Sequence, residues 1–465
     1  MSRRADIILR RVRPLGGALG DVAIKDGLIW QSGSVTCSGP ELDGAGAQLF
    51  PGLIDHHVHL LATAARMRSL DLHGLTTQAE LVSALRAHAE TLPVSAWVRA
   101  VNYDERAAGL PDADQLADWL PHHKLRMQDR TGALWLLNRQ ALADLGQGPF
   151  PSGVAVSADG RPSGVIRRED GWLRSHLPQE TPGLSALSRQ CAAWGLTGFT
   201  DAGAGNGAEE ARLLSDARQS GALLQRLCLM GTEDLPESVA FARGPLKLLY
   251  DDANLPDLDD FVARIRTARA QGRAVAAHCV TVAELALFLA ALDAAGGGRW
   301  GDRVEHGGLI PADFISELRR HRLTVVTQPD FIRTRGDRYR AEIDRVEWPD
   351  LYRLGSLAKA GVAISVGSDA PYGSCNPWEA IRSGMNRTTK AGNSLGSGEA
   401  LPPQPLLAMF GGTFQHPSQL RTLDPGQTAD LVLLDDDWAE QLQDEAAVPV
   451  KGTWIDGRCQ FGVGL

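Results

Sequence analysis

The sequence has few cysteines and no Cys-x-x-Cys pair. Six cysteines are scattered over 465 residues: Cys37, Cys191, Cys228, Cys279, Cys375 and Cys459. Proteins that depend on disulfides for stability are usually short, secreted and much richer in cysteine. We therefore expect reduced thiols in a cytoplasmic protein and no disulfide framework.

A long hydrophobic run is also lacking. The longest apolar stretch, AELALFLAALDAA (283–295), contains Glu284 and Asp293 and is too short to span a bilayer. The first residues, MSRRADIILRRVRP, contain arginines but no long apolar core. We therefore expect neither a membrane span nor a signal peptide.

The chain has no excess of positive charge. Its formal net charge is −9 at pH 7, which disfavours nucleic acid or an anionic membrane as the main partner. Hydrophobic residues make up 43% and charged residues 22% of the chain, as in an ordinary soluble globular enzyme. We expect a small-molecule substrate as the partner, and a homodimer is left open.

The sequence does contain a series of short apolar segments, most of them followed by a helical pattern. The segments are LIDHHVHL (53–60), GFTDAG (198–203), LQRLCLM (224–230), LKLLY (246–250), AVAAHC (274–279), RVEHG (303–307), LTVVTQP (323–329) and AISVGSD (363–369). Helical patterns such as residues 258–272 and 282–298 lie between several of them. Eight strands with intervening helices predict an α/β fold, a (β/α)8 TIM barrel.

Both ends of the chain have the character of β-strands. Residues 5–50 and the segments 429–435 and 452–462 are strand-like, with Asp-Gly turn signals at 26–27 and 456–457. We expect one small β-sandwich domain built from residues 1–52 and 405–465, with the barrel in residues 53–404.

Residues 61–190 are too many for a single connection between a strand and the next helix. They contain helical patterns at 76–92 and 112–120 and a strand-like LRMQD (125–129). We interpret them as a large insertion after strand one. Since it follows the carboxyl end of a strand, we expect it over the barrel mouth.

The segment PGLIDHHVHL (51–60) contains three of the chain's 12 histidines. Side chains alternate between faces along a strand, so Asp55, His57 and His59 share one face. Two imidazoles about 6.5–7 Å apart on one face can bind one cation. The alternative is a pair of hydrogen-bonded core histidines, which is costly on a buried face without a shared partner.

Other ionisable residues occupy predicted strands, mostly at their carboxyl ends, where barrel enzymes carry their active sites. They are Lys247 in strand four, His278 in strand five, His306 in strand six and Asp369 in strand eight. Taken singly, each has a structural alternative: a strand-end lysine, core histidines, or a helix N-cap at Asp369. As a set with His57 and His59, they predict a site for zinc or a similar metal.

These segments, in this order, resemble the signature segments of the amidohydrolase superfamily, as does LDPGQTADLVLLD (423–435). RMQDRTGALWLLNRQAL (126–142) and DGRPSGVIRRE (159–169) resemble more narrowly the YtcJ-like branch, amidohydrolase family 3, which includes N-substituted formamide deformylases. The resemblance covers nearly the whole chain.

The resemblance implies a role for each residue. His57, His59 and Asp369 would hold the more buried metal, and His278 and His306 a second one. Lys247 would be N6-carboxylated and bridge the two ions. The expected cofactor is a divalent metal, zinc, as one or two ions. Asp251 matches an acidic position of the branch, whereas Asp252 stands where glycine is usual.

The chain departs from its relatives in the segment QDRTGALW (128–135), where Asp129 and Ala133 replace frequent histidines. The pocket wall is therefore expected to differ. The substrate-binding candidates are Tyr103, Asp129, Arg130, Trp135, Glu169, Gln328 and Trp378, with Asn138 nearby. For residues 129–138, a packed insertion helix with a capped start is the competing interpretation.

The predicted function is metal-dependent hydrolysis of a C–N bond in an amide, formamide or cyclic amide. Metal coordination lowers the pKa of water from about 15.7 to near 7, and Asp369 is predicted to pass the proton to the departing nitrogen. The first alternative is a deaminase of an aminated heterocycle with a mononuclear site, which would not need Lys247. A phosphotriesterase or lactonase and a non-catalytic scaffold of the same fold are also left open.

Overall fold

The structure is a computed structural model that describes residues 4–130, 132–146, 148–157, 160–177, 183–250 and 255–462. By its internal contacts the chain divides into two compact units. One comprises residues 1–63 and 183–465, and the other residues 64–182. Asp251 and Asp252 lie outside the described residues.

The first unit contains an eight-stranded parallel sheet, and each of the eight predicted segments overlaps one of its strands. In spatial order the strands are Ala363–Val366 (β19), Thr324–Thr327 (β18), Arg303–His306 (β17), Val275–Cys279 (β16), Ala242–Leu248 (β15), Arg226–Gly231 (β14), Leu196–Asp201 (β13) and Leu53–Val58 (β6). Most residues of these strands are buried, as expected for a sheet covered on both faces. The predicted TIM barrel is confirmed.

The barrel is closed where its last strand meets its first. The backbone N–H of Asp369 donates to the carbonyl of His57 at 2.7 Å, and that of His59 to Ala370 at 2.9 Å. Gly367 makes this approach possible: a Cβ there would lie 2.5 Å from the His57 backbone nitrogen. Closure therefore brings Asp369 beside the two histidines of the first strand.

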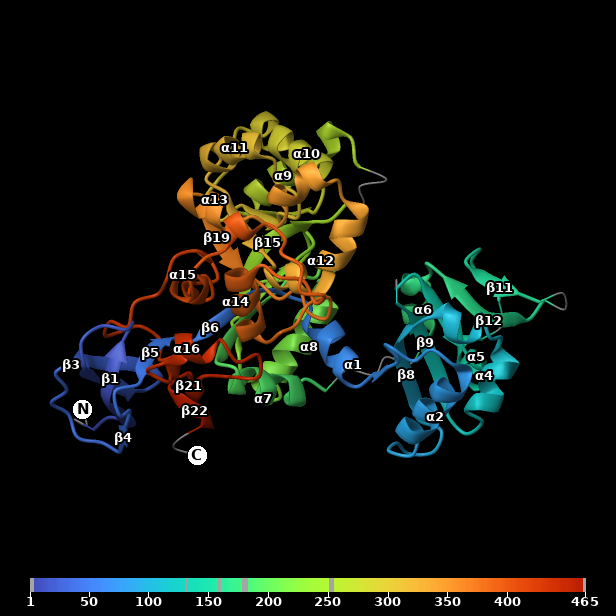
Figure 1. Ribbon diagram of the computed structural model, residues 1–465, viewed down its shortest axis with the longest axis horizontal. Coiled ribbons are helices and arrows are strands. Elements are labelled where there is room, and N and C mark those ends of the chain that lie inside the picture. The colour runs from blue at the N-terminus through green and yellow to red at the C-terminus, as the bar shows by residue number, and fades with distance from the viewer. Residues whose placement is uncertain are drawn as a thin grey trace. The chain divides into compact units, whose positions relative to one another are not determined.

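Helices connect the strands and surround the sheet (Figure 1). They are Leu60–Met67 (α1), Ser185–Ala193 (α7), Ala208–Gln219 (α8), Leu258–Ala270 (α9), Val282–Ala294 (α10), Ile315–Arg320 (α11), Asp330–Glu342 (α12), Gly355–Lys359 (α13), Pro377–Asn386 (α14) and Pro403–Ala408 (α15). Thr281 caps α10 in a capping box with Glu284, and the predicted glycine run follows its end. Within the described residues, no helix is long and apolar enough to cross a membrane.

Strands from both ends of the chain form one mainly antiparallel sheet in the same unit (Figure 1, blue and red). They are Ile7–Pro14 (β1), Gly20–Lys25 (β2), Leu28–Gly33 (β3), Glu41–Asp43 (β4), Gln48–Pro51 (β5), Leu431–Leu434 (β20), Val450–Ile455 (β21) and Arg458–Gly462 (β22), with the short helix Trp438–Gln441 (α16) after β20. β5 pairs with β20, which joins the two ends directly. This is the extra β domain of the predicted fold; its predicted limits, 1–52 and 405–465, stay a prediction.

The second unit, residues 64–182, has its own sheet and core. Its strands, in the order β11-β12-β10-β9-β8-β7, are Val154–Val156, Pro162–Arg167, Leu134–Leu137, Lys124–Asp129, Trp97–Tyr103 and Leu70–Asp71. Its helices are Gln78–Ala89 (α2), Glu105–Ala108 (α3), Ala113–Trp119 (α4), Arg139–Leu142 (α5) and Asp170–His176 (α6). That residues 61–190 form an insertion over the barrel mouth stays a prediction.

Candidate metal centre

The six predicted ligand residues come from strands β6, β15, β16 and β17 and from the segments after β6 and β19. His57 lies in β6 and His59 directly after it. Lys247, His278 and His306 lie at or next to the last residues of their strands. Asp369 follows β19 by three residues. Because carboxyl ends of parallel strands in a barrel share one rim, these side chains can converge.

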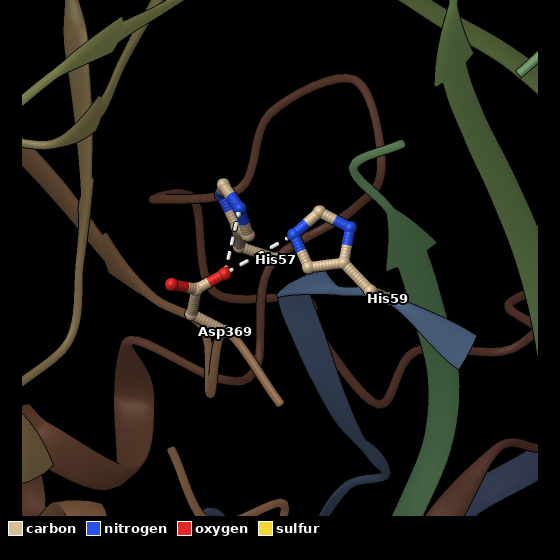
Figure 2. A group of neighbouring side chains, drawn as sticks. All are labelled: His57, His59 and Asp369. Carbon is tan, nitrogen blue, oxygen red and sulfur yellow. Dashed lines mark ion pairs between the residues drawn. The ribbon is translucent and has the colours of Figure 1, made fainter. Parts of the chain in front are cut away.

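His57, His59 and Asp369 form the tightest group (Figure 2). Oδ1 of Asp369 lies 3.3 Å from Nε2 of His57 and 3.2 Å from Nε2 of His59. One ligand atom from each residue lies within 4.8 Å of the others. Two imidazole nitrogens and a carboxylate oxygen are the donors that a borderline divalent ion such as zinc prefers, so the group fits a metal.

His306 and His278 extend the group on the far side of His57. The ring centroids of His57 and His306 are 4.7 Å apart, and those of His306 and His278 are 4.5 Å apart. Nδ1 of His306 lies 3.9 Å from Oδ2 of Asp369. The structure therefore brings the four predicted histidines and Asp369 into one cluster.

Lys247 is the unusual member of the cluster because its amine is buried. The residue is 3% exposed, and within the described residues Nζ has no hydrogen-bond partner. Burial lowers the pKa of Lys247, although the nearby carboxylates of Glu305 and Asp369 act in the opposite direction. A buried amine without a partner is costly, so Lys247 is an unfavourable choice for a position with a purely structural role.

The protonation states of His278, His306 and Asp369 suit metal ligands, whereas the carboxylates beside His57 raise its pKa against the effect of burial. Burial and the charge of Lys247 lower the pKa of His278 to about 4, which leaves its ring neutral. Burial also holds the pKa of His306 well below its usual value. Burial would raise the pKa of Asp369, but hydrogen bonds from His57 and His59 outweigh it and keep the carboxylate ionised. Neutral imidazoles and an ionised carboxylate are the forms that coordinate metals.

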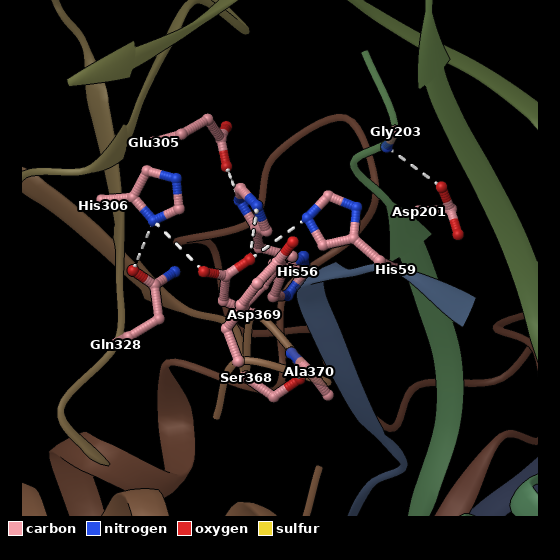
Figure 3. Close-up of polar contacts among 12 residues, drawn as sticks. His56, His59, Asp201, Gly203, Glu305, His306, Gln328, Ser368, Asp369 and Ala370 are labelled. Carbon is pink, nitrogen blue, oxygen red and sulfur yellow. Dashed lines mark hydrogen bonds and ion pairs between the residues drawn. The ribbon is translucent and has the colours of Figure 1, made fainter. Parts of the chain in front are cut away.

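The sequence analysis missed Glu305, which lies next to His306 in β17 (Figure 3). Its Oε2 forms a short contact with Nδ1 of His57, and its Oε1 accepts a hydrogen bond of 2.7 Å from Nε of Arg303. The sequence does contain a sign of this role, because two charged residues are unusual within a buried strand such as RVEH. For Asp55, the sequence analysis noted only that it shares a strand face with His57 and His59. It accepts from the backbone N–H groups of His57 and Ser368, and so ties β6 to the end of β19.

Among the substrate-binding candidates in the barrel unit, Gln328 contacts the metal cluster. Its Oε1 lies 2.9 Å from Nδ1 of His306, so it contacts a ligand residue (Figure 3). Trp378 is fully buried, and its indole N–H donates to the carbonyl of Trp194, which precedes β13. Trp378 is therefore a core residue at the opposite end of a barrel strand.

The remaining candidates lie in residues 64–182. Tyr103 is buried and donates to Gly109, and Asp129 accepts from the N–H of Leu134. The other three are also held locally: the N–H of Arg130 bonds to Tyr103, Trp135 contacts Arg99 and Arg126, and Glu169 accepts from Gly153. Asn138 caps α5, but residues 129–134 join two strands, so the competing interpretation of a helix is wrong there. Their role toward a substrate stays a prediction.

Tyr372 is a further residue beside the cluster that the sequence analysis missed. It follows Asp369 by three residues and is 64% exposed. Its ring centroid is 6.0 Å from that of His59 in an edge-on arrangement. It is therefore an exposed aromatic side chain beside one of the predicted ligand residues.

The sequence of this chain matches the model of the amidohydrolase family over residues 41–461. The chain belongs to the amidohydrolase family. Predicted membership of this family, and with it an enzyme, is confirmed. Among proteins similar to this amidohydrolase is an N-substituted formamide deformylase from Arthrobacter pascens, 24% identical over 90% of this chain and 89% of the relative. Another is a putative amidohydrolase, YtcJ, from Bacillus subtilis, 23% identical over 95% of both chains.

The fold of this amidohydrolase is also similar to solved structures. One is an uncharacterized metal-dependent hydrolase from Pyrococcus furiosus, with a TM-score of 0.74 at 16% identity over 92% of this chain and 98% of that one. At this identity the similarity supports the fold alone.

Proposed function

We propose that this chain is a metal-dependent hydrolase that cleaves a C–N bond in a small-molecule amide, formamide or cyclic amide. The observation that carries the proposal is the convergence of four histidines, Asp369 and the buried Lys247 at one end of the barrel. The similarity to a formamide deformylase supports the choice of bond.

The proposed metal is zinc, in two positions. His57, His59 and Asp369 would hold one ion, and His278 with His306 would hold the other. When bound, such an ion polarises a carbonyl group and makes hydroxide available near neutral pH. The spacing of the donor atoms of His57, His59 and Asp369, all within 4.8 Å of one another, supports the first position.

Lys247 is proposed to carry a carboxyl group on its amine. The neutral Nζ attacks carbon dioxide, a C–N bond forms and one proton leaves, so that a carbamate anion replaces the amine. Nζ has no hydrogen-bond partner among the described residues, and the oxygens of the carbamate would supply further metal ligands at this position. Charge also favours it, because an anion between two cations is stabilised where an ammonium would be repelled.

Asp369 is proposed to move the proton during the reaction. Its Oδ1 faces both His57 and His59, whereas Oδ2 faces His306 at 3.9 Å. Oδ2 would take the proton from the attacking water and deliver it to the departing nitrogen. The exposed ring of Tyr372 would contact the substrate beside His59.

The proposal is tested by metal analysis and a substrate panel. We expect close to two equivalents of zinc per chain, an intact mass that is larger by one carbon dioxide, and release of formate or acid from N-formyl and N-acyl amines. Ammonia released only from aminated heterocycles, with one metal and an unmodified Lys247, would instead support the deaminase. Absence of metal after reconstitution would contradict both functions.

The proton transfer is tested with Asp369→Asn. We expect the variant to fold and to keep most of its metal, and kcat to fall by about 10²–10⁴, the usual contribution of general acid–base catalysis. Asp293→Asn is the matched control, because Asp293 is an exposed residue of α10 paired with Arg320. Full activity of Asp369→Asn would rule out this role.

A further inference from the structure

A buried ion pair inside the barrel contacts the metal cluster. Glu305 is 0% exposed, and its Oε1 accepts from Nε of Arg303 at 2.7 Å. Its Oε2 accepts from Nη2 of Arg303 at 3.1 Å and also faces Nδ1 of His57 in a short contact. Nη2 of Arg303 donates in addition to the carbonyl of His56, the residue before His57. The pair therefore holds both the ring and the backbone at His57.

Stability alone does not explain why a buried ion pair occupies this position. Removing two charges from water is expensive, and well-packed apolar side chains would often stabilise a core as well or better. Arg303 and Glu305 are both 1% exposed or less and lie in β17. Among the described residues, the pair contacts the metal cluster through Glu305, at His57.

The geometry fixes which nitrogen of His57 keeps its hydrogen when a metal binds. An ionised Glu305 only accepts hydrogen bonds, so the Nδ1 that faces it must carry the hydrogen. Nε2 faces the ionised Asp369 at 3.3 Å and donates to it in the metal-free protein, so it is the nitrogen that would lose its hydrogen to a metal between His57 and Asp369. An imidazole can bind a metal only through the nitrogen that lacks the hydrogen.

We propose that Arg303 and Glu305 are positioning residues that set the tautomer of His57 and thereby preorganise the metal site. This inference rests on the proposed metal centre and goes beyond it by assigning residues that do not bind the ion. Arg303 orients Glu305 with two hydrogen bonds, Glu305 orients the ring, and Arg303 anchors the backbone through His56.

Glu305→Gln tests the proposal directly, because glutamine keeps the shape of the glutamate side chain but replaces one carboxylate oxygen with an amide NH2. Arg303 only donates hydrogen bonds, so it will take the single amide oxygen of the new side chain. The amide NH2 then faces Nδ1 of His57 and forces it to accept, which leaves the ring hydrogen on Nε2, where the metal would bind. We expect zinc affinity, measured by competition with a chromogenic chelator, to fall by about 10- to 100-fold. The visible spectrum of the cobalt-substituted protein should change as well.

Asp302→Asn is the matched control. Asp302 directly precedes Arg303, is also 0% exposed, and is paired with Arg269. It bonds to the backbone of Val275 and to no histidine in the described residues. This variant also breaks a buried ion pair next to the same strand. We expect it to lower thermal stability as much as Glu305→Gln does, with wild-type zinc affinity and an unchanged cobalt spectrum.

The tautomer itself is read in the zinc-loaded wild-type protein. With ¹⁵N-labelled histidine, and His57 assigned through its backbone resonances, we expect hydrogen on Nδ1 and a metal-bound Nε2. Hydrogen on Nε2 would overturn the proposal, and this measurement does not depend on the folding of a variant. Equal zinc affinity and spectrum in Glu305→Gln and wild type would also overturn it. Loss of all metal from the wild type would count against the proposed function instead.

Discussion

Lys247 is the residue where burial and charge conflict most strongly. Its side chain lies in a strand of the barrel, it is 3% exposed, and its amine has no hydrogen-bond partner among the described residues. An unmodified lysine there would destabilise the core, whereas a carbamate that binds metal would not. A substitution of Lys247 therefore distinguishes a role in stability from a role in metal binding.

We expect Lys247→Met to change the free energy of unfolding of the metal-free protein by less than about 1.5 kcal/mol, because methionine has a similar volume and removes the buried amine. Metal content should fall by at least one equivalent per chain, and activity should fall with it. Elemental analysis and chemical denaturation measure the two effects. Lys359→Met, at an exposed position of α13, should change neither, and a Lys247→Met protein with full metal content would exclude the bridging role.

Residue types and strand ends were sufficient to nominate the four histidines, Lys247 and Asp369, because local sequence determines where each strand ends. Glu305 escaped because it is adjacent to His306, and alternation along a strand assigns neighbours to opposite faces. Its contact joins it to a histidine 248 residues away, a relation that local patterns do not contain. Local patterns also do not show that Trp378 donates to the carbonyl of Trp194, because packing sets that contact.

At the scale of elements, the closure between β19 and β6 decides the geometry of the site. Asp369 reaches His57 and His59 only because these two strands are neighbours in space, although they stand at opposite ends of the barrel sequence. Gly367 lies against the backbone and Cβ of His57, with no room for a side chain. The packing of Gly367 against His57 therefore sets the position of a predicted metal ligand.

Gly367→Ala should therefore damage both stability and metal binding. A methyl group at this position would meet His57 at about 2.5 Å, so the strands must separate, at a cost of about 1–3 kcal/mol. Gly398→Ala is the control, because nothing lies within 4 Å of a Cβ there. Differential scanning calorimetry and metal analysis of both variants check the prediction; unaltered metal binding in Gly367→Ala would show that the site tolerates a wider closure.

The elements differed in how well local sequence predicts them. Fully buried barrel strands are short apolar runs, which the sequence displays clearly. In residues 64–182, the helices at 78–89 and 113–119 and the strand at 124–129 were also predicted. The strand Trp97–Tyr103 was missed, because its buried and partly exposed residues alternate imperfectly and include an arginine.

For the whole molecule, one core joins the two ends of the chain. Leu9, Val22 and Leu49 from the N-terminal strands pack in one cluster with Leu431 and Trp454 from the C-terminal strands. Trp454 is 0% exposed. Because the cluster needs both ends, this sheet cannot form its core until the whole chain has been made.

Trp454→Ala should destabilise the protein by about 3–5 kcal/mol, the range found when a large buried aromatic side chain is truncated. Trp300→Ala is the matched control, since Trp300 is 69% exposed and should matter little. Chemical denaturation of both variants measures the difference. Zinc affinity of folded Trp454→Ala should be that of the wild type, and a loss of affinity would indicate that the terminal sheet also shapes the metal site.

The sequence by itself determined the number of barrel strands, the residue types at their ends and the membership of the amidohydrolase family. These properties depend on local runs of apolar residues and on which side chains follow them. Only the tertiary structure decided which nitrogen of His57 faces Asp369, that Arg303 and Glu305 lie behind it, and that Trp378 belongs to the core. The physical reason is that these contacts depend on register and closure between strands far apart in the chain, which no local pattern specifies.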